Sequence, residues 1–563
     1  MIISNVFSRA ICLLLLIGLS FSVLAQDTSQ AQRQHEQRLK EEQDRLRERL
    51  NRDNPQQDVF LQPQVRRQDN DLPTDENAAC INVSLITVQG VTVIDEDKVN
   101  NITKSYIGRC LSLSDINRLI ADVSNLYLDK GFITSRAFVQ PQKIEKGTLD
   151  LLVVEGKIEK FQSPGKMIKR QLNAAFPVEE NTILNLRDLE QGIEQLNRLQ
   201  QNAAQLDIKP GSDTGLSIVN VINDQSRALH AQVFVDNSGS EPTGKYLAGG
   251  SISWDNPLNM SDSLYVSVSE AMQGNPGGSS RSYALNYSIP QGYFLWSLSA
   301  NHFNYEQLIA GSGIDFTTSG ESDNQSVGLD YIAYRSQRSK WAINTDITKK
   351  VSKNYIEDVF LDTSSRTLYL ASIGINTTYK MNSSLVRGGI NWINSFDAGD
   401  ATQKLVQSET DYQFNKYTVD LGISGGFDFF KQQFRYNSSI NYFYSPTSIV
   451  ASEALSLGGQ YTVRGFDQES VTGYKGGYWR SEISYPQTFW NKIRLEPFVG
   501  YDIGQSDAPD YNQDKMTLSG ATFGLRSVYA NFYMNAVYST ALAVPEFLTK
   551  EQSVFMFDAR VSF

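Results

Sequence analysis

Hydrophobic and polar residues alternate one by one through the C-terminal part of the chain, from about residue 231 onward. In YLAGGSISW (246–254) one face carries Tyr246, Ile252 and Trp254, and the other carries small or polar residues. The stretch SLYVSVS (263–269) repeats the pattern. A period of two residues with a polar opposite face is typical of β-strands. Soluble sandwiches share this pattern, so alternation alone leaves the class of β-protein open.

The last strand favours a barrel that faces lipid. In SVFMFDARVSF (553–563) one face is apolar and ends on the aromatic Phe563, whereas the other carries Asp558 and Arg560. An apolar outside and a charged inside are typical of a transmembrane barrel with a wet lumen. No later segment approaches the ~20 consecutive apolar residues of a membrane helix. We therefore predict an outer-membrane β-barrel, with Phe563 as its membrane-assembly signal.

The first 25 residues predict a signal peptide. Arg9 is the only charge in this stretch, and the apolar run AICLLLLIGLSFSVLA follows it. Val23 and Ala25 suit a signal-peptidase site, which places the mature N-terminus at Gln26. A single N-terminal anchor helix is the alternative, but the run is short and lacks basic flanks.

A polar, Gln-rich leader comes next, divided into residues 26–52 and 53–78. HEQRLKEEQDRLRERL (35–50) predicts a helix from its propensity and from charge pairs three and four residues apart. Its apolar face is too thin to dock on an ordinary core. Two interpretations remain open, a solvated helix followed by a flexible linker, or a helix that occupies a polar, water-filled space.

Residues 79–229 have the composition of small α/β domains. A first unit contains the strand CINVSLITVQG (80–90), the helix SLSDINRLIADVSNLYLDKG (112–131) and the strands within AFVQPQKIEKGTLDLLVVEG (137–156). A second unit contains IEKFQS, MIKRQLNAAF, LRDLEQGIEQLNRLQ, AQLDIKPG and LSIVNVIND. Two units of about 75 residues, each ordered strand–helix–helix–strand–strand, predict a tandem repeat at 79–156 and 157–229.

Cysteine usage fits an oxidising compartment. Cys12 lies in the predicted signal peptide, so Cys80 and Cys110 are the pair of the mature chain. Such a pair is predicted to form a disulfide, which would stabilise the domain by roughly 3–4 kcal/mol on the chain-entropy model. Two free buried thiols are the alternative. The chain has 3 histidines in all, so a metal site would lack ligands, and no metal or cofactor is predicted.

Motifs that suggest an enzyme are incomplete. GNPGGSSRS (274–282) is glycine-rich but lacks the Gly-Lys-Ser/Thr of a phosphate loop. SPGK (163–166) fits a Ser-x-x-Lys pattern without companion motifs. We predict that the protein is not an enzyme.

These segments resemble the two-partner secretion transporters (TpsB) of the haemolysin and contact-dependent-inhibition type. YLDKGFITSRAFVQPQKIEKGTLDLLVVEGKIEKF (127–161) is similar to their first polypeptide-transport-associated (POTRA) domain. LNLRDLEQGIEQLNRLQ (184–200) with IKPG (208–211) is similar to the second. VDNSGSEPTGKY and WDNPLNMSDSL resemble the first barrel strands and their turn. The resemblance extends from about Cys80 to Phe563 and implies a 16-stranded barrel over 230–563.

The resemblance also assigns a role to YTVRGFDQES (461–470). In the family a long extracellular loop, here around 455–475, folds into the lumen and carries a motif that corresponds to Val463, Arg464, Gly465 and Phe466. A second motif on an inner barrel strand corresponds, within FVGYDIG, to Phe498, Gly500, Asp502 and Gly504. The resemblance implies a salt bridge between Arg464 and Asp502, in which a guanidinium fork fixes the loop.

The resemblance implies that residues 26–52 form a plug helix in the barrel and residues 53–78 a linker. It implies secretion of one large exoprotein, such as a haemolysin, contact-dependent toxin or adhesin, across a Gram-negative outer membrane. The partner's N-terminal secretion domain would meet the periplasmic POTRA domains by β-augmentation. Other expected partners are membrane lipid and the barrel-assembly machinery; no nucleic acid is expected, and the protein is expected to be a monomer.

Two other functions are compatible with parts of the pattern. A barrel-assembly factor of the same superfamily shares the loop motif but usually carries three to five POTRA repeats, whereas this chain has room for two. A passive porin would not need POTRA domains.

Overall fold

The computed structural model describes residues 42, 44, 45, 58–61, 79–144, 147–165, 167–272, 278–309, 315–402, 410–467, 469–490, 492–548 and 553–563. The predicted signal peptide (1–25) lies outside these residues. Of the predicted plug helix, Glu42, Asp44 and Arg45 are described, and all are helical. Within the described residues, no helix is both long and apolar enough to cross a membrane.

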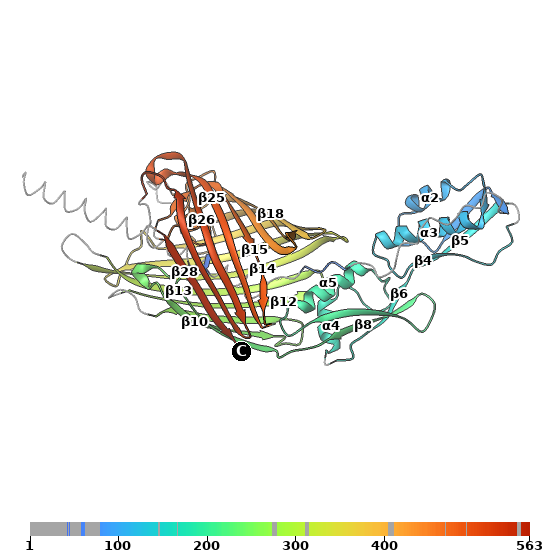
Figure 1. Cartoon of the computed structure of the whole chain (residues 1–563), viewed down its shortest axis with the longest axis horizontal. Helices are drawn as coiled ribbons and strands as arrows, with labels where there is room; N and C mark the ends of the chain where they lie inside the picture. Colours follow the sequence, from blue (N-terminus) through green and yellow to red (C-terminus); the bar gives the residue numbers. More distant parts are fainter. Residues whose placement is uncertain are drawn as a thin grey trace, which may run out of the picture.

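The C-terminal part forms a closed antiparallel β-barrel, drawn from green to red in Figure 1. Within the described ranges, two short strands, β16 Val359–Phe360 and β24 Gln487–Phe489, lie at the hairpins β15–β17 and β23–β25, whose longer strands also pair directly. Sixteen strands therefore build the wall, as predicted. They are β9 Leu229–Asp236, β10 Leu247–Asp255, β11 Ser263–Ala271, β12 Ser279–Gln291, β13 Phe294–Ile309, β14 Phe316–Arg335, β15 Ser339–Ile356, β17 Arg366–Met381, β18 Ser384–Phe396, β19 Asn415–Phe429, β20 Gln432–Tyr444, β23 Lys475–Ser484, β25 Ile493–Ala508, β26 Gln513–Tyr529, β27 Phe532–Ala543 and β28 Val554–Ser562.

Alternation of side chains explains the two faces of the wall. In β10, Ile252 and Trp254 are half exposed on the outer face, while Ser251 and Ser253 are buried. An apolar outer surface around a polar interior is what a barrel in a bilayer requires. The same rule orients β28, where Asp558 and Arg560 are buried on the inner face.

The last residue takes part in closing the barrel. Strand β28 pairs with β9 in antiparallel register. Beyond that ladder, the Phe563 N–H donates to the Ala231 carbonyl at 2.7 Å, and the Ala231 N–H donates back at 3.3 Å. Phe563 therefore pairs at the seam of the barrel; its part in membrane assembly stays a prediction.

The first α/β domain contains a three-stranded sheet in the order β2-β5-β4, with helices packed on it. Helix α3 begins with a capping box, in which Ser112 and Asp115 satisfy each other's backbone N–H. The strand predicted over 80–90 is two strands, because β1 leaves the sheet to pair with β3, to which the Cys80–Cys110 disulfide joins it. The elements are β1 Cys80–Val83, β2 Leu85–Gln89, α2 Glu96–Lys104, β3 Arg109–Ser112, α3 Leu113–Asp129, β4 Arg136–Val139 and β5 Thr148–Val154.

The second α/β domain has the predicted strand–helix–helix–strand–strand order, with a sheet ordered β6-β8-β7. The first domain differs, because β3 lies between its two helices. Its helices pack closely because α5 carries Gly192, where an added Cβ would lie 2.1 Å from the Phe176 ring. The elements are β6 Lys157–Gln162, α4 Lys169–Ala175, α5 Leu186–Asn197, β7 Ala204–Pro210 and β8 Leu216–Asn223.

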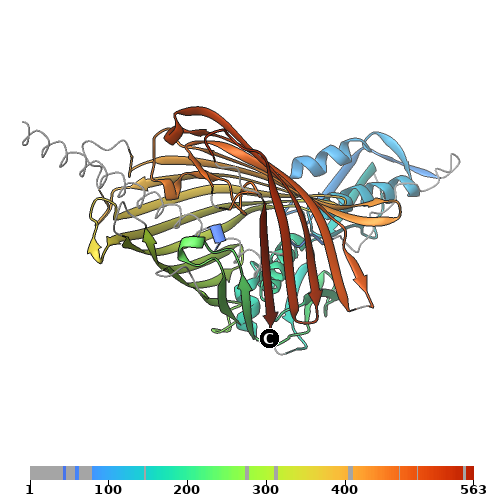
Figure 2. The same cartoon turned by 60° about the vertical axis from the view of Figure 1, so that its left-hand side comes forward.

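The two α/β domains follow one another away from one end of the barrel. Figure 1 shows α4 and α5 next to the barrel and the domain of α2 and α3 at the far end of the molecule. Figure 2 gives the view after a turn of 60°, in which both domains lie partly behind the barrel. Polar contacts tie the end of α5 to the barrel, since Arg198, the residue after the helix, donates to the Ser261 carbonyl and to the Ser288 hydroxyl, both at 2.6 Å.

Candidate functional site

A long loop between β20 and β23, residues 445–474, folds inside the barrel, and we call it the lumen loop. It contains the 3-10 turn η3 Ala451–Glu453 and a small β-pair, β21 Leu455–Leu457 with β22 Val471–Gly473. Val463 and Phe466 are almost fully buried in an apolar cluster with wall residues that include Leu518 and Ala541. The predicted loop around 455–475 therefore packs on the inner wall.

Arg464 of the lumen loop is bound to Asp502 of β25 by three hydrogen bonds. Its Nε donates to Oδ2 at 2.6 Å, its Nη2 donates to Oδ1 at 2.8 Å, and its backbone N–H donates to Oδ2 at 3.0 Å. Asp502 is fully buried. A bidentate guanidinium–carboxylate pair fixes orientation as well as distance, so one residue sets both the position and the direction of the loop.

Two further charged residues extend this pair across the wall. Arg464 Nη1 lies 3.4 Å from the carboxylate of Glu482 on β23. The same carboxylate forms an ion pair with Arg526 of β26, at 2.6 Å. The Arg526 guanidinium lies 4.0 Å from the centre of the Phe498 ring, which is cation–π distance. Sequence reasoning placed Phe498 in the wall motif but missed Glu482 and Arg526. Strand alternation could have placed Glu482 and Arg526 on the inner face of the barrel. It could not have shown that their strands lie next to the lumen loop.

Glycines in the wall make room for the loop backbone and for Arg464. A Cβ added at Gly500 would lie 2.5 Å from Arg464 Nη2, and one added at Gly520 would lie 1.8 Å from the Arg464 carbonyl oxygen. A Cβ at Gly504 would approach the Val463 side chain to 2.9 Å. Real Cβ atoms do not approach other atoms this closely. These glycines form what we call the glycine seat, and Gly520 is a member that sequence reasoning missed.

Gly465 is required for a different reason. Its φ is +109°, which L side chains rarely adopt, and an added Cβ would lie 2.6 Å from the backbone of Thr540. Beside the seat, Gly524 accommodates the Phe498 ring, which an added Cβ would approach to 2.2 Å. The predicted loop and wall residues are thus brought together in one contact region, whose functional role stays a prediction.

A second ion-pair cluster holds the lumen loop at η3. Glu453 is buried and forms ion pairs with Lys350 of β15, at 2.5 Å, and with Lys416 of β19, at 2.7 Å. Nearby, Arg366 donates to the Ser452 hydroxyl at 3.1 Å. Ion pairs therefore attach the loop to β15 and β19 as well as to β25.

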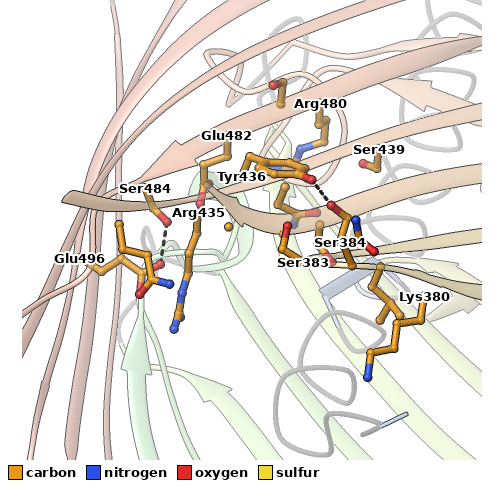
Figure 3. A pocket seen from close by; sticks show the side chains of 18 of the residues that line it. Lys380, Ser383, Ser384, Arg435, Tyr436, Ser439, Arg480, Glu482, Ser484 and Glu496 are labelled. Atoms are coloured by element: carbon orange, nitrogen blue, oxygen red, sulfur yellow. Dashed lines mark hydrogen bonds between the residues drawn. The ribbon is translucent and has the colours of Figure 1, made fainter. Parts of the chain in front are cut away.

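Polar cavities lie beside the loop. One of about 910 Å³ is bordered by Arg464, Glu482 and residues of β17 to β26, and Figure 3 shows Lys380 and Arg435 extending into it. Another, of about 200 Å³, is bordered by Arg464 and by the helical residue Arg45. Arg45 donates to the Ser238 carbonyl at 2.8 Å. Among the residues that the structure describes, no group of His, Cys, Asp and Glu could hold a metal ion.

Comparison with known proteins identifies related sequences over most of the chain. A family model described as haemolysin secretion/activation protein ShlB/FhaC/HecB matches residues 215–527. Models of the ShlB-type POTRA domain and of a POTRA domain match 81–156 and 157–210. These two ranges overlap the two predicted repeats.

Individual relatives cover the chain broadly. The outer membrane transporter CdiB of Dickeya dadantii is 30% identical over 72% of this chain and 72% of its own. CdiB of Escherichia coli is 29% identical over 99% of this chain and 94% of its own. A solved structure of CdiB from Escherichia coli superposes with a TM-score of 0.88 at 26% identity, covering 93% of this chain and 98% of that one.

Proposed function

This chain belongs to the haemolysin secretion/activation protein family ShlB/FhaC/HecB and is an outer-membrane transporter of two-partner secretion, and we propose that it exports one large exoprotein through its barrel. The observation that carries this proposal is a polar lumen occupied by a loop that ion pairs, hydrogen bonds and packing attach to the wall. Such non-covalent contacts break and reform without cleavage of a covalent bond. The lumen can therefore admit a chain and close again.

The two POTRA domains would receive the exoprotein in the periplasm. Each has a three-stranded sheet, and β4 and β7 are edge strands in the orders β2-β5-β4 and β6-β8-β7. An edge strand offers unpaired backbone groups to an extended peptide, and this mode of binding tolerates varied sequence. We infer that the exoprotein's N-terminal secretion domain binds here while unfolded.

Passage would then use the polar interior. Charged side chains such as Lys380, Arg435 and Glu482 border a cavity of about 910 Å³, and such a lining suits a hydrated polypeptide. The exoprotein folds outside, which supplies the direction of travel without a nucleotide. We also infer insertion by the barrel-assembly machinery, contact with membrane lipid and function as a monomer. The leader helix (26–52) acts as a plug in this scheme, and Phe563 as the assembly signal.

Secretion of the protein encoded beside this gene tests the proposal. Cells that carry the native chain, no chain, or the Arg464→Ala variant are compared for that protein in the medium, with heat-modifiable gel mobility as the control for barrel insertion. We expect export with the native chain, none without it, and strongly reduced export with the variant. Export from cells that lack the chain would show that this transporter does not serve that protein.

A further inference from the structure

Four residues of the leader, 58–61, lie between helix α5 and the adjoining rim of the barrel, and we call their binding site the junction groove. The Val59 N–H donates to Glu194 Oε2 at 3.1 Å, and the Leu61 N–H donates to Glu190 Oε1 at 2.7 Å. Arg335, the last residue of β14, donates through Nη2 to the Val59 carbonyl at 3.0 Å. These bonds go to the main chain of every second residue, which is how an extended peptide is held.

The side chains of the other two residues face the barrel. The Asp58 carboxylate is buried, forms an ion pair with Lys340 of β15 and accepts from Arg387 of β18 at 2.8 Å. Phe60 is 8% exposed, and Lys380 lies 5.8 Å from its ring centre. A carboxylate and an aromatic ring two residues apart thus fill two adjacent positions on the wall.

The groove itself is a built network of buried charges. Glu194 bridges Arg335 and Lys340, and Glu190 accepts from Arg187 at 2.6 Å. The buried Glu190 Oε2 and Arg335 Nε lie 3.6 Å apart, and neither makes a hydrogen bond among the described residues. Asp58 is the carboxylate that Lys340 and Arg387 share, so removing residues 58–61 would take this acidic partner from both cations, which favours an anionic group in its place.

We propose that the junction groove is an entry site for the exoprotein, and that residues 58–61 occupy it in place of an exoprotein segment. The segment would be extended and would carry a carboxylate followed two residues later by an aromatic or large apolar side chain. Hydrogen bonds to main-chain groups tolerate other differences in sequence. This inference rests on the proposed secretory function and adds to it the chemistry of one recognition site.

The position of the groove suits entry to the lumen. Asp58 borders both the cavity of about 910 Å³ that reaches Arg464 and a second cavity, of about 280 Å³, that α5 also borders. An occupant of the groove is therefore in contact with the second POTRA domain and with the lumen at once. When an exoprotein segment binds, it displaces residues 58–61 from this rim. Entry of the exoprotein and release of the leader therefore occur together.

Peptide binding to the full-length protein in detergent tests the inference. The probe is a fluorescent peptide of residues 54–64, NPQQDVFLQPQ, and the control peptide is NPQQNVALQPQ. The transporter is compared as the native chain, as Asp58→Asn/Phe60→Ala, and as that variant with Lys340→Ala/Arg387→Ala added. Heat-modifiable mobility confirms that each barrel is folded.

We expect the probe to bind the Asp58→Asn/Phe60→Ala chain at least about tenfold more tightly than the native chain, whose own segment competes at high effective concentration. The control peptide and the chain without Lys340 and Arg387 should show little binding. A probe that does not bind the weakened chain would show that residues 58–61 are a fixed anchor, and would overturn the inference.

The second step uses the exoprotein. The N-terminal region of the protein encoded beside this gene is added to the probe complex. We expect it to displace the probe from the Asp58→Asn/Phe60→Ala chain, and we expect its own binding, measured directly, to weaken when Lys340→Ala/Arg387→Ala is added. If the probe binds and this region does not displace it, while the secretion assay shows export, the groove is not the entry site although the transporter function stands.

Discussion

Arg464 is held by a carboxylate that has no access to water, and this makes the pair sensitive to the loss of either partner. Asp502 is fully buried and receives three donors from Arg464. Removing one member of a buried pair leaves an uncompensated charge, which costs about 3–5 kcal/mol. Removing both charges leaves no such charge. The two positions should therefore be strongly coupled.

A double-mutant cycle measures this coupling. We expect Arg464→Ala to raise hydrogen exchange and proteolysis in the lumen loop strongly, and Arg464→Ala/Asp502→Asn to restore part of the protection, because no charge then lies unpaired. Arg464→Lys should protect less than native, since a point charge cannot bind both carboxylate oxygens. If the loss of protection in the double variant equals the sum of the losses in the two single variants, a direct pair is contradicted.

The glycine seat makes a second prediction at the residue scale. Gly520→Ala would put a Cβ 1.8 Å from the Arg464 carbonyl oxygen, whereas Gly388→Ala on β18 would bring its Cβ no nearer than 3.6 Å to another residue. We expect Gly520→Ala to displace the loop, with faster hydrogen exchange over 455–467, and Gly388→Ala to leave it unchanged. Equal exchange in both variants would show that the close approach is not needed.

Residue-scale contacts were only partly predictable from the sequence. The resemblance located Arg464, Gly465 and Asp502, because these residues belong to short motifs. Glu482 and Arg526 lie on two different strands, and their contact depends on strand register across the barrel. Alternation gives a residue's face but not its neighbour on the next strand, so these partners required the structure.

At the scale of elements, helix α5 couples the second POTRA domain to the barrel, and one of its residues makes the coupling depend on pH. Burial raises the pKa of Glu190 to about 7, although Arg187 and Arg335 act in the opposite direction. A junction that opens would return Glu190 to its ordinary pKa of 4.5. The closed junction has the higher pKa, so protonation favours it.

Ionised Glu190 destabilises the closed junction fully above about pH 7, and this effect disappears as the pH falls toward 4.5. We expect the opening free energy from hydrogen exchange in α5 to rise by about 1 kcal/mol between pH 8 and pH 6. Glu190→Gln should abolish that rise; an equal rise in the variant would assign the pH dependence to another group.

Elements that carry a periodic pattern were predicted well, and those defined by distant pairing were not. Period-two alternation gave the barrel strands, and Ser114 and Asp115 near the start, with Gly131 as the stop, marked the helix that corresponds to α3. The stretch 80–90 looks like one strand in sequence, yet its first half pairs with β3 and its second half with β5. Local sequence does not record which partner a strand chooses.

At the scale of the whole molecule, the chain combines two POTRA domains with a sixteen-stranded barrel, as the sequence indicated. The place of residues 58–61 could not be predicted, because they lie in a polar, Gln-rich leader with no periodicity. Their contacts depend on charges contributed by α5, β14, β15 and β18, which meet only in the folded protein. Composition therefore suggested a linker where the structure has a bound segment.

Site-specific photo-crosslinking tests whether the exoprotein passes through the lumen. A benzophenone side chain replaces Arg435, which borders the lumen cavity, or Ile440, which is half exposed on the outer face of the same strand β20. Cells are irradiated during secretion of the protein encoded beside this gene. We expect a crosslinked adduct with that protein at 435 and none at 440. Adducts at 440 alone, or at neither position in cells that still export the protein, would contradict passage through this barrel.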